Sequence, residues 1–266
     1  EVNARFDVGM PYSNNSILVA GLGIGRNREV YYMTKDFSSS DTSDLSLVNL
    51  ISLYGAFEKN TFNNRQFATK GSYLKLSLRA GYGSEFYQPG STGEQVLNEK
   101  MYYFWFSARV ENTSYQNLGS GFSLGYHYVM HLGFKPLLSN YYSSIIDAPA
   151  FQPNLITKSL FMENYRANQY IGVGLMPLYS IGQTRHTKVE MYGYFPVQEI
   201  LRDDYNEAYL GNYFSSMKYI LNASFNYLSV VGPIGFHVGY ISDTEKPWIV
   251  QLSFGYLLFN QKSDED

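Results

Sequence analysis

The chain has 266 residues, of which 16% are charged and 17% aromatic, a net charge of −3 and no cysteine. Its mean hydropathy of −0.24 is too polar for a helical membrane protein, and no apolar run reaches the ~18 residues of a membrane helix. The lack of cysteine excludes a disulfide framework and thiolate sites, and the net negative charge argues against nucleic acid as a partner. Low charge and many aromatic residues suit a transmembrane β-barrel, with a soluble β-sandwich as the alternative.

Apolar residues recur at every second position in the first half of the chain, which predicts strands with one apolar face. In chain order these strands are 2–10, 18–24, 45–58, 74–82, 102–111 and 122–130. The segment 45–58 alternates poorly and is the least regular of them. The connections 11–15 and 112–120 are predicted turns, 58–72 is a connector, and 26–44 and 83–100 are predicted long polar loops.

The same period of two continues in the second half of the chain, after the longest connection, 131–168. The predicted strands there are 170–175, 188–197, 218–227, 234–240 and 248–258. Connections of that length without regular structure are usually functional or disordered. The connection 198–217 is also long, whereas 180–187 and 230–232 are short. Long and short connections tend to alternate, which is typical of outer-membrane barrels.

The faces opposite the apolar ones carry charged residues. They include Lys75, Arg79, Arg109, Glu111 and Lys188. In a barrel such residues would line a wet lumen while the apolar band faces lipid. The prediction is therefore an all-β, antiparallel transmembrane β-barrel over residues 1–259, with 260–266 as a polar C-terminal tail.

The predicted strand count, about 11–12, is informative. Single-chain bacterial barrels have an even number of strands, and an unpaired strand edge is costly in lipid. Residues 1–5 also lack the basic start and apolar run of a signal peptide. The sequence is therefore expected to be a mature product or a fragment whose barrel includes further strands.

Two patterns that are typical of catalytic or metal sites are present but weak. Residues 121–125 match the G-x-S-x-G nucleophile pattern around Ser123, yet that chemistry needs a strand-to-helix turn and these residues lie in a predicted strand. The histidines show no ligand spacing with carboxylates; they are His127, His131, His186 and His237. No catalysis, metal or cofactor is expected on this chain.

Several motifs resemble one family of barrels. The strings SVVGPIG at 229–235, EKPW at 245–248 and FGYLLF at 254–259 resemble the end of the surface-antigen superfamily, which contains outer-membrane assembly factors and two-partner secretion transporters. More narrowly, EKNTFNNRQFATKG at 58–71 and FPVQEI at 195–200 are similar to the C-terminal barrel of Bacteroidetes-type patatin-like phospholipases. The resemblance runs through essentially the whole chain.

The resemblance implies a barrel of about sixteen strands whose sixth outer loop, here 131–168, enters the lumen and carries an Arg-Gly-aromatic motif. The matching residues are Tyr165, Arg166, Asn168 and Tyr170; Ala167 replaces the glycine, and the aromatic is displaced. The family's arginine pairs with an acidic residue on the wall, which implies a contact between Arg166 and Glu190. Gly172 and Gly174 would let the loop approach the wall closely. The tail 260–266 departs from the family's aromatic C-terminus.

The resemblance also implies a function. The chain would be an integral protein of a Gram-negative outer membrane that anchors an upstream patatin-like phospholipase domain and helps to translocate it. Its partners would be phospholipid, lipopolysaccharide and the upstream domains or other chains that complete the barrel. The alternatives are the barrel of an assembly or secretion transporter, and a passive porin-like channel.

Overall fold

The computed structural model describes residues 2–34, 36–64, 67–92, 99–230 and 232–255. The main feature is an antiparallel sheet of 11 strands in the order β1-β2-β3-β4-β5-β6-β7-β8-β11-β12-β13. The strands are β1 (Val2–Ser13), β2 (Ser16–Tyr31), β3 (Asp44–Asn60), β4 (Gly71–Gln88), β5 (Glu99–Gly119), β6 (Phe122–Phe134), β7 (Gln169–Ile181), β8 (Arg185–Pro196), β11 (Lys218–Ser229), β12 (Gly232–Ile241) and β13 (Trp248–Phe254). The predicted all-β antiparallel fold is confirmed.

The remaining elements are short and lie in two of the connections. Between β6 and β7 are α1 (Tyr141–Asp147), α2 (Leu155–Lys158) and the 3-10 helix η1 (Glu163–Tyr165), and between β8 and β11 is the hairpin of β9 (Ile200–Arg202) and β10 (Ala208–Leu210). Among the described residues, no helix is both long and apolar enough to cross a membrane.

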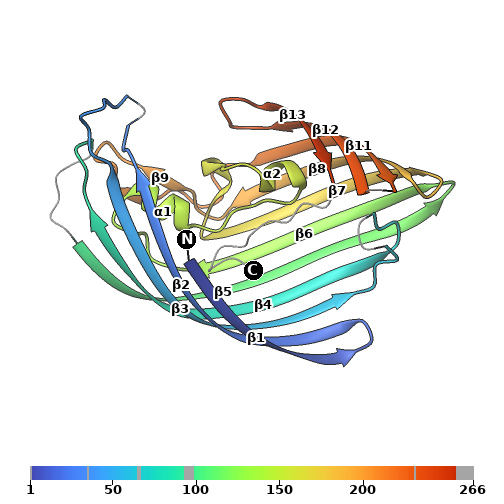
Figure 1. Cartoon of the computed structure of the whole chain (residues 1–266), viewed down its shortest axis with the longest axis horizontal. Coiled ribbons are helices and arrows are strands. Elements are labelled where there is room, and N and C mark those ends of the chain that lie inside the picture. Colours follow the sequence, from blue (N-terminus) through green and yellow to red (C-terminus); the bar gives the residue numbers. More distant parts are fainter. Residues whose placement is uncertain (1, 35, 65–66, 93–98, 231, 256–266) are drawn as a thin grey trace.

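The sheet is strongly curved, and α1 and α2 lie on its concave side (Figure 1). β1 and β13 stand at the two ends of the strand order, so each has one edge on which the described sheet ends. The chain thus forms a curved wall around a segment that belongs to one of its own connections.

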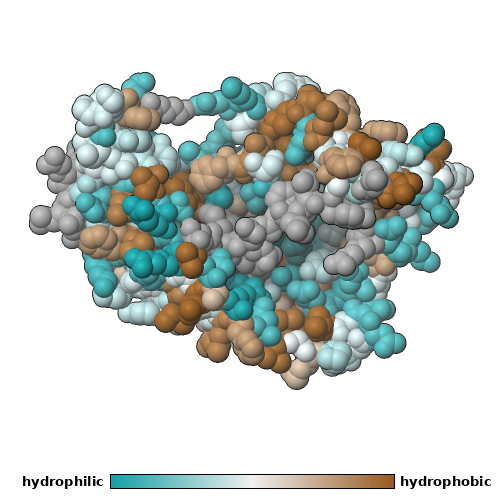
Figure 2. Space-filling view, in the orientation of Figure 1, coloured by the Kyte–Doolittle hydropathy of each residue, from teal (hydrophilic) through white to brown (hydrophobic). Residues whose placement is uncertain are grey.

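The two faces of the wall are inverted relative to a soluble sheet. On β4, Leu78 and Tyr82 of the convex face are 56% and 52% exposed, whereas Ser77 and Arg79 of the concave face are 3% and 2% exposed. The same alternation recurs in β3, β5, β6, β11 and β13. Figure 2 shows hydrophobic residues gathered over β12 and β13 and along the lower margin near β1. In these strands the apolar side chains therefore lie on the exposed, convex face, and the polar side chains lie on the buried, concave face.

Several strands are longer than the apolar alternation predicted. β5 continues through the expected turn 112–120 to Gly119, and β2 and β4 extend into the expected loops 26–44 and 83–100. The outward residues of these extensions include Asn112, Ser114 and Gln116, which are polar, so the apolar face ends before the strand pairing does. The predicted end of the last strand, 256–258, and the tail 260–266 lie outside the described residues.

Connections separate by length onto the two ends of the sheet. Tight turns at 14–15, 120–121 and 182–184 join strands at one end, here named the turn end. The opposite end, named the loop end, carries 32–43, 135–168 and 197–217. The connection 61–70 is an exception, because it is long and lies at the turn end. The expected alternation of long and short connections is otherwise confirmed.

Candidate functional site

The candidate site is residues 135–168, named the inserted segment, which lie against the concave face. Its Phe151, Ile156, Met162 and Tyr165 form one buried cluster with wall residues from β7, β8, β11 and β12. Those wall residues include Tyr170, Tyr192, Tyr194, Ile220 and Ile241. The segment thus replaces water on the concave face with an apolar core.

Two wall glycines leave space for this core. A Cβ placed on Gly172 would lie 2.3 Å from Cε2 of Phe151, and one on Gly239 would lie 2.7 Å from Cδ1 of Ile156. At Gly174 the nearest atoms belong instead to Tyr192 of the wall, at 2.4 Å. Gly172 therefore seats the inserted segment directly, whereas Gly174 accommodates a wall side chain.

The two helices of the segment begin at asparagines. The side chain of Asn140 accepts a hydrogen bond from the backbone N–H of Ser143 at 2.9 Å, and Asn154 accepts one from Thr157 at 3.1 Å. The hydroxyl oxygens of Ser143 and Thr157 in turn accept hydrogen bonds from the backbone N–H groups of Asn140 and Asn154, which completes a capping box at each helix. This Asn-x-x-Ser/Thr spacing is the sequence signal for the helices, and an alternation of period two does not reveal it.

The segment is fixed to the wall at its start by a buried carboxylate. Glu85 of β4 accepts hydrogen bonds from the Ser46 hydroxyl at 2.8 Å and from the N–H and hydroxyl of Ser139 at 2.9 and 2.7 Å. Lys135 forms an ion pair with Asp147, which joins the two ends of the stretch that contains α1. Neither contact was expected from the sequence.

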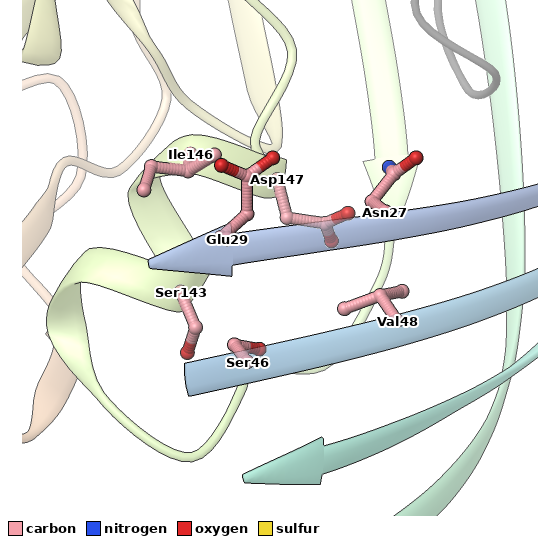
Figure 3. A pocket seen from close by; sticks show the side chains of 7 residues that line it. All are labelled: Asn27, Glu29, Ser46, Val48, Ser143, Ile146 and Asp147. Carbon is pink, nitrogen blue, oxygen red and sulfur yellow. The ribbon is translucent and has the colours of Figure 1, made fainter. Parts of the chain in front are cut away.

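A small pocket lies where α1 meets the wall (Figure 3). Its wall side is formed by Asn27 and Glu29 of β2 and by Ser46 and Val48 of β3; its other side is formed by Ser143, Ile146 and Asp147. In Figure 3 these side chains face one another between the helix and the two strands. The pocket therefore lies at the contact surface between the inserted segment and the wall.

Arg166 and Glu190 are placed differently from the expected pair. The guanidinium of Arg166 donates from Nη1 to the carbonyl oxygens of Ile146 and Ala148 at 3.0 and 2.7 Å. It also lies over the Phe161 ring, 4.7 Å from the centroid. Arg166 therefore holds the C-terminal end of α1 and stabilises the segment from within.

Glu190 is engaged by its own side of the wall. Its carboxylate contacts Nζ of Lys188 at 2.5 Å, the hydroxyl of Tyr192 at 3.1 Å and the side-chain amide of Asn222 at 2.6 Å. The expected Arg166–Glu190 contact is thus corrected: a neighbouring lysine on the same strand neutralises Glu190, and backbone carbonyls occupy Arg166.

The other expected lumen charges lie on the concave face and contact neighbours there. Arg109 pairs with Glu111 at 2.9 Å and donates to the Tyr170 hydroxyl at 3.1 Å. Lys75 lies 3.4 Å from Glu58, and Arg79 lies over the Tyr54 ring, 5.1 Å from its centroid. Lys75, Arg109 and Lys188 therefore each lie beside a carboxylate on this face.

The remaining motif residues also position the segment. The side-chain amide of Asn168 donates to the Lys135 carbonyl at 3.1 Å, which ties the two ends of the segment together. The hydroxyl of Tyr165 lies 2.9 Å from the carbonyl oxygen of Tyr219 and 3.0 Å from that of Ser242. Burial raises the pKa of Tyr165 to about 12, so this hydroxyl stays protonated and donates at physiological pH.

The loop end is joined across the wall by two basic residues. Lys218 lies 2.5 Å from Glu199, 3.3 Å from Asp243 and 2.8 Å from the Asn164 carbonyl, and thereby connects three loops. Arg202 of β9 donates to the Met33 carbonyl at 2.8 Å, although the two are far apart in sequence. Ile200 packs on Ile145 of α1 and on Ala148, which follows the helix, so the β9–β10 hairpin covers α1.

The turn end is approached by the exceptional connection 61–70. The Phe67 ring stacks on His186 of β8 with centroids 4.6 Å apart and planes at 9°, and Phe62 meets Tyr115 of β5 at 6.0 Å. Since His186 lies four strands away from β4 in the sheet order, this connection reaches across the concave side. The concave side is therefore bridged at both ends.

Ser123 and the histidines occupy strand positions. Ser123 is fully buried on β6 just after a hairpin turn. His127, His186 and His237 contact Thr113, Ser180 and Ser253 at 2.9, 2.9 and 3.2 Å, and His131 stacks on Tyr170 at 5.5 Å. Within the part of the chain that the structure describes, no three His, Cys, Asp or Glu residues are grouped to hold a metal ion.

No protein-family model matches the chain, and no curated protein matches it.

Proposed function

We propose that this chain is the C-terminal part of a transmembrane β-barrel in a Gram-negative outer membrane, and that it serves as a closed anchor. The observation that carries the proposal is the inverted sheet: exposed leucine, phenylalanine and tyrosine on the convex face, and buried serine, arginine and glutamate on the concave face. In water this arrangement would expose an apolar surface far larger than the patches of ordinary soluble proteins. Lipid on the convex face removes that cost.

The dimensions of the apolar face support the proposal. On β4 the outward residues are apolar from Leu74 to Tyr82, a stretch of about nine residues at ~3.3 Å each. With a strand tilt of ~40°, it spans roughly 20–25 Å, close to the apolar band of outer-membrane barrels. Beyond it the outward residues become polar, with Arg26 and Arg28 at the loop end and Asn112 and Ser114 at the turn end.

Aromatic residues border the band at both ends. The outward set at the loop end is Tyr82, Tyr102, Phe104, Tyr219, Tyr240 and Trp248. The set at the turn end is Tyr12, Phe57, Phe122, Tyr126, Tyr179 and Tyr227. Two such girdles are typical of proteins that meet the lipid headgroups at two depths.

The inserted segment favours an anchor over a passive channel. An open pore needs a wet lumen, whereas Phe151, Ile156 and Tyr165 form a buried apolar core with the wall. The resemblance to patatin-like phospholipase barrels supports the further proposal that the anchored unit is an upstream lipase domain. Strands that complete the barrel next to β1 and β13 would come from the same upstream region or from another chain.

A matched pair of arginine substitutions tests the lipid-facing assignment. Leu78 lies in the middle of the outward band of β4, whereas Leu118 lies near the turn end of β5, beyond the band, and the two are similarly exposed at 56% and 53%. Arginine costs ~2–4 kcal/mol at the bilayer midplane and ~0–1 near an interface. We expect L78R to abolish the folded, wash-resistant protein in outer membranes and L118R to preserve it.

If the chain were a water-soluble sheet, both variants would accumulate equally, and that result would refute the membrane assignment. Intact mass and N-terminal sequence of the membrane-extracted protein then test the anchor. A species well above 30.4 kDa with a lipase domain upstream supports the anchor, and one with periplasmic repeats favours a transporter. A mature species of 30.4 kDa would exclude both the lipase anchor and the transporter as single chains with an upstream region.

A further inference from the structure

The stretch 208–217, named the rim segment, combines high exposure with an absence of charge. Its sequence, AYLGNYFSSM, contains no acidic or basic residue. Tyr213, Phe214 and Met217 are 71%, 59% and 61% exposed. Exposed loops that face only water are rarely rich in such side chains, so this composition indicates a surface that contacts something outside the chain.

Backbone hydrogen bonds fix the rim segment at the loop end of the wall. The N–H of Gly211 donates to the Glu199 carbonyl at 2.9 Å, and the N–H of Phe214 donates to the Val197 carbonyl at 2.8 Å. The segment therefore runs back along the chain that leaves β8, immediately before β11 begins at Lys218. Its first residues, in β10, pack with β9 over α1, and its last residue leads directly into β11.

The rim segment continues the aromatic girdle of the loop end. Trp248 contacts Tyr240 with ring centroids 5.0 Å apart, and Tyr240 stacks on Tyr219 at 5.8 Å. Met217 lies two residues before Tyr219 of β11, and both side chains are exposed, whereas Lys218 between them is buried. Exposed apolar residues thus occur both on the outward face of β11 and in the rim segment that precedes it.

The backbone at Phe214 is strained. Its φ of 50° lies in the left-handed region, which bulky residues seldom adopt and which costs on the order of 1 kcal/mol or more. The strain is held by the Phe214–Val197 bond, yet the ring remains largely exposed. Within the described chain, contacts of this ring therefore do little to offset the strain. This indicates that the ring contacts a surface outside the chain.

We propose that the rim segment is an interfacial anchor that seats Tyr213, Phe214 and Met217 among the headgroups and upper acyl chains of the outer leaflet. Aromatic and thioether side chains suit this layer, where one end of a group meets hydrocarbon and the other meets water. The acidic residues Asp203, Asp204 and Glu207 precede the segment and stay in water, which limits its depth. This inference rests on the proposed lipid contact of the sheet.

Site-directed spin labelling tests the inference cleanly, because the chain has no cysteine. Single cysteines at Tyr213 and Phe214 report on the rim. A cysteine at Ala223, outward in the middle of β11, serves as the lipid reference, and one at Phe37, exposed in the loop 32–43, serves as the water reference. Each full-length protein, with any cysteine outside this chain replaced by serine, is reconstituted in vesicles of outer-membrane lipid, and collision rates with oxygen and with a nickel chelate are measured.

We expect the ratio of oxygen to nickel collisions at 213 and 214 to exceed that at 37 several-fold and to fall below that at 223. If the collision ratio at positions 213 and 214 equals that at position 37, while the ratio at position 223 is that of a lipid-exposed site, the interfacial anchor is wrong and the membrane assignment stands. If 213 and 214 are shielded from both reagents, another protein covers the rim and the anchor is again wrong. If 223 itself matches 37, the proposed lipid face fails.

Discussion

The backbone N–H and the hydroxyl of Ser139 both donate to one carboxylate oxygen of Glu85, so the inserted segment starts on a fully buried charge of the wall. Charge-assisted bonds of this kind are each worth ~1.5–3 kcal/mol when a partner is lost. These two hydrogen bonds connect β4 to a residue that is distant from it in the sequence.

We expect E85A to release the start of the inserted segment and to lower the free energy of unfolding by about 2–3 kcal/mol. The measurement is limited proteolysis of membrane-embedded protein, read as cleavage within 135–168, together with the urea midpoint. E207Q, which removes an exposed carboxylate, is the control and should leave both unchanged. Equal resistance of E85A and wild type would show that the apolar core alone holds the segment.

The wall glycines offer a test of close packing. G172A places a methyl group 2.3 Å from Phe151 and 2.8 Å from Val129, and overpacking of this kind costs ~1–3 kcal/mol. G55A adds the same methyl on β3, where no atom lies within 4 Å, so it should be neutral or slightly stabilising. Urea midpoints of the two variants in lipid decide it, and equal midpoints would mean that Phe151 moves away at no cost.

Arg166 is expected to stabilise the segment internally. R166A removes the donor to Ile146 and Ala148, and we expect a loss of about 2 kcal/mol together with faster proteolysis near α1. R28A, which removes an exposed guanidinium from the outward face of β2, is the matched control. An R166A variant as resistant as R28A would show that the carbonyl contacts contribute little.

The pH dependence of the loop end follows from Glu199. Burial raises the pKa of this carboxyl, but the hydrogen bond and charge of Lys218 outweigh it, and the pKa lies below its ordinary value of 4.5. A depressed carboxyl pKa contributes stability above the unfolded value of about 4.5, and this contribution is lost as the pH falls through the folded value.

The stability difference between wild type and E199Q should therefore be largest near neutral pH, begin to shrink near pH 4.5 and vanish as the pH falls below the folded pKa. Urea midpoints from pH 7 to pH 3 measure it. A difference that persists undiminished at pH 3 would show that the role of Glu199 is independent of its charge.

Alternating apolar residues predicted the strands best where, in the proposed arrangement, one face of the strand contacts lipid. This alternation failed at 112–119, because the outward residues Asn112 and Ser114 lie beyond the apolar face while strand pairing continues. It was weakest at β3, whose inward Val48 and Leu50 are apolar as well. They pack against Leu138 of the inserted segment, which a period of two cannot reveal.

The candidate site was located by the length of 131–168, but its contacts were not. Hydrogen bonds from Arg166 to carbonyl oxygens leave no side-chain pattern in the sequence. The attachment of Ser139 to Glu85 joins residues too distant for any local rule. The capping asparagines, Asn140 and Asn154, were the one readable signal, and they predict where helices begin rather than what they touch.

The strand order of the main sheet has a consequence for how the protein forms. Every neighbour in the sheet is also the next long strand in the chain, so each pairing closes only the intervening connection. The wall can therefore assemble progressively, hairpin by hairpin, at low entropic cost. In the proposed barrel, the exception would be the joining of the edges at β1 and β13 to further strands. We expect that closure to be the slow step of biogenesis, since it brings together the ends of the longest loop.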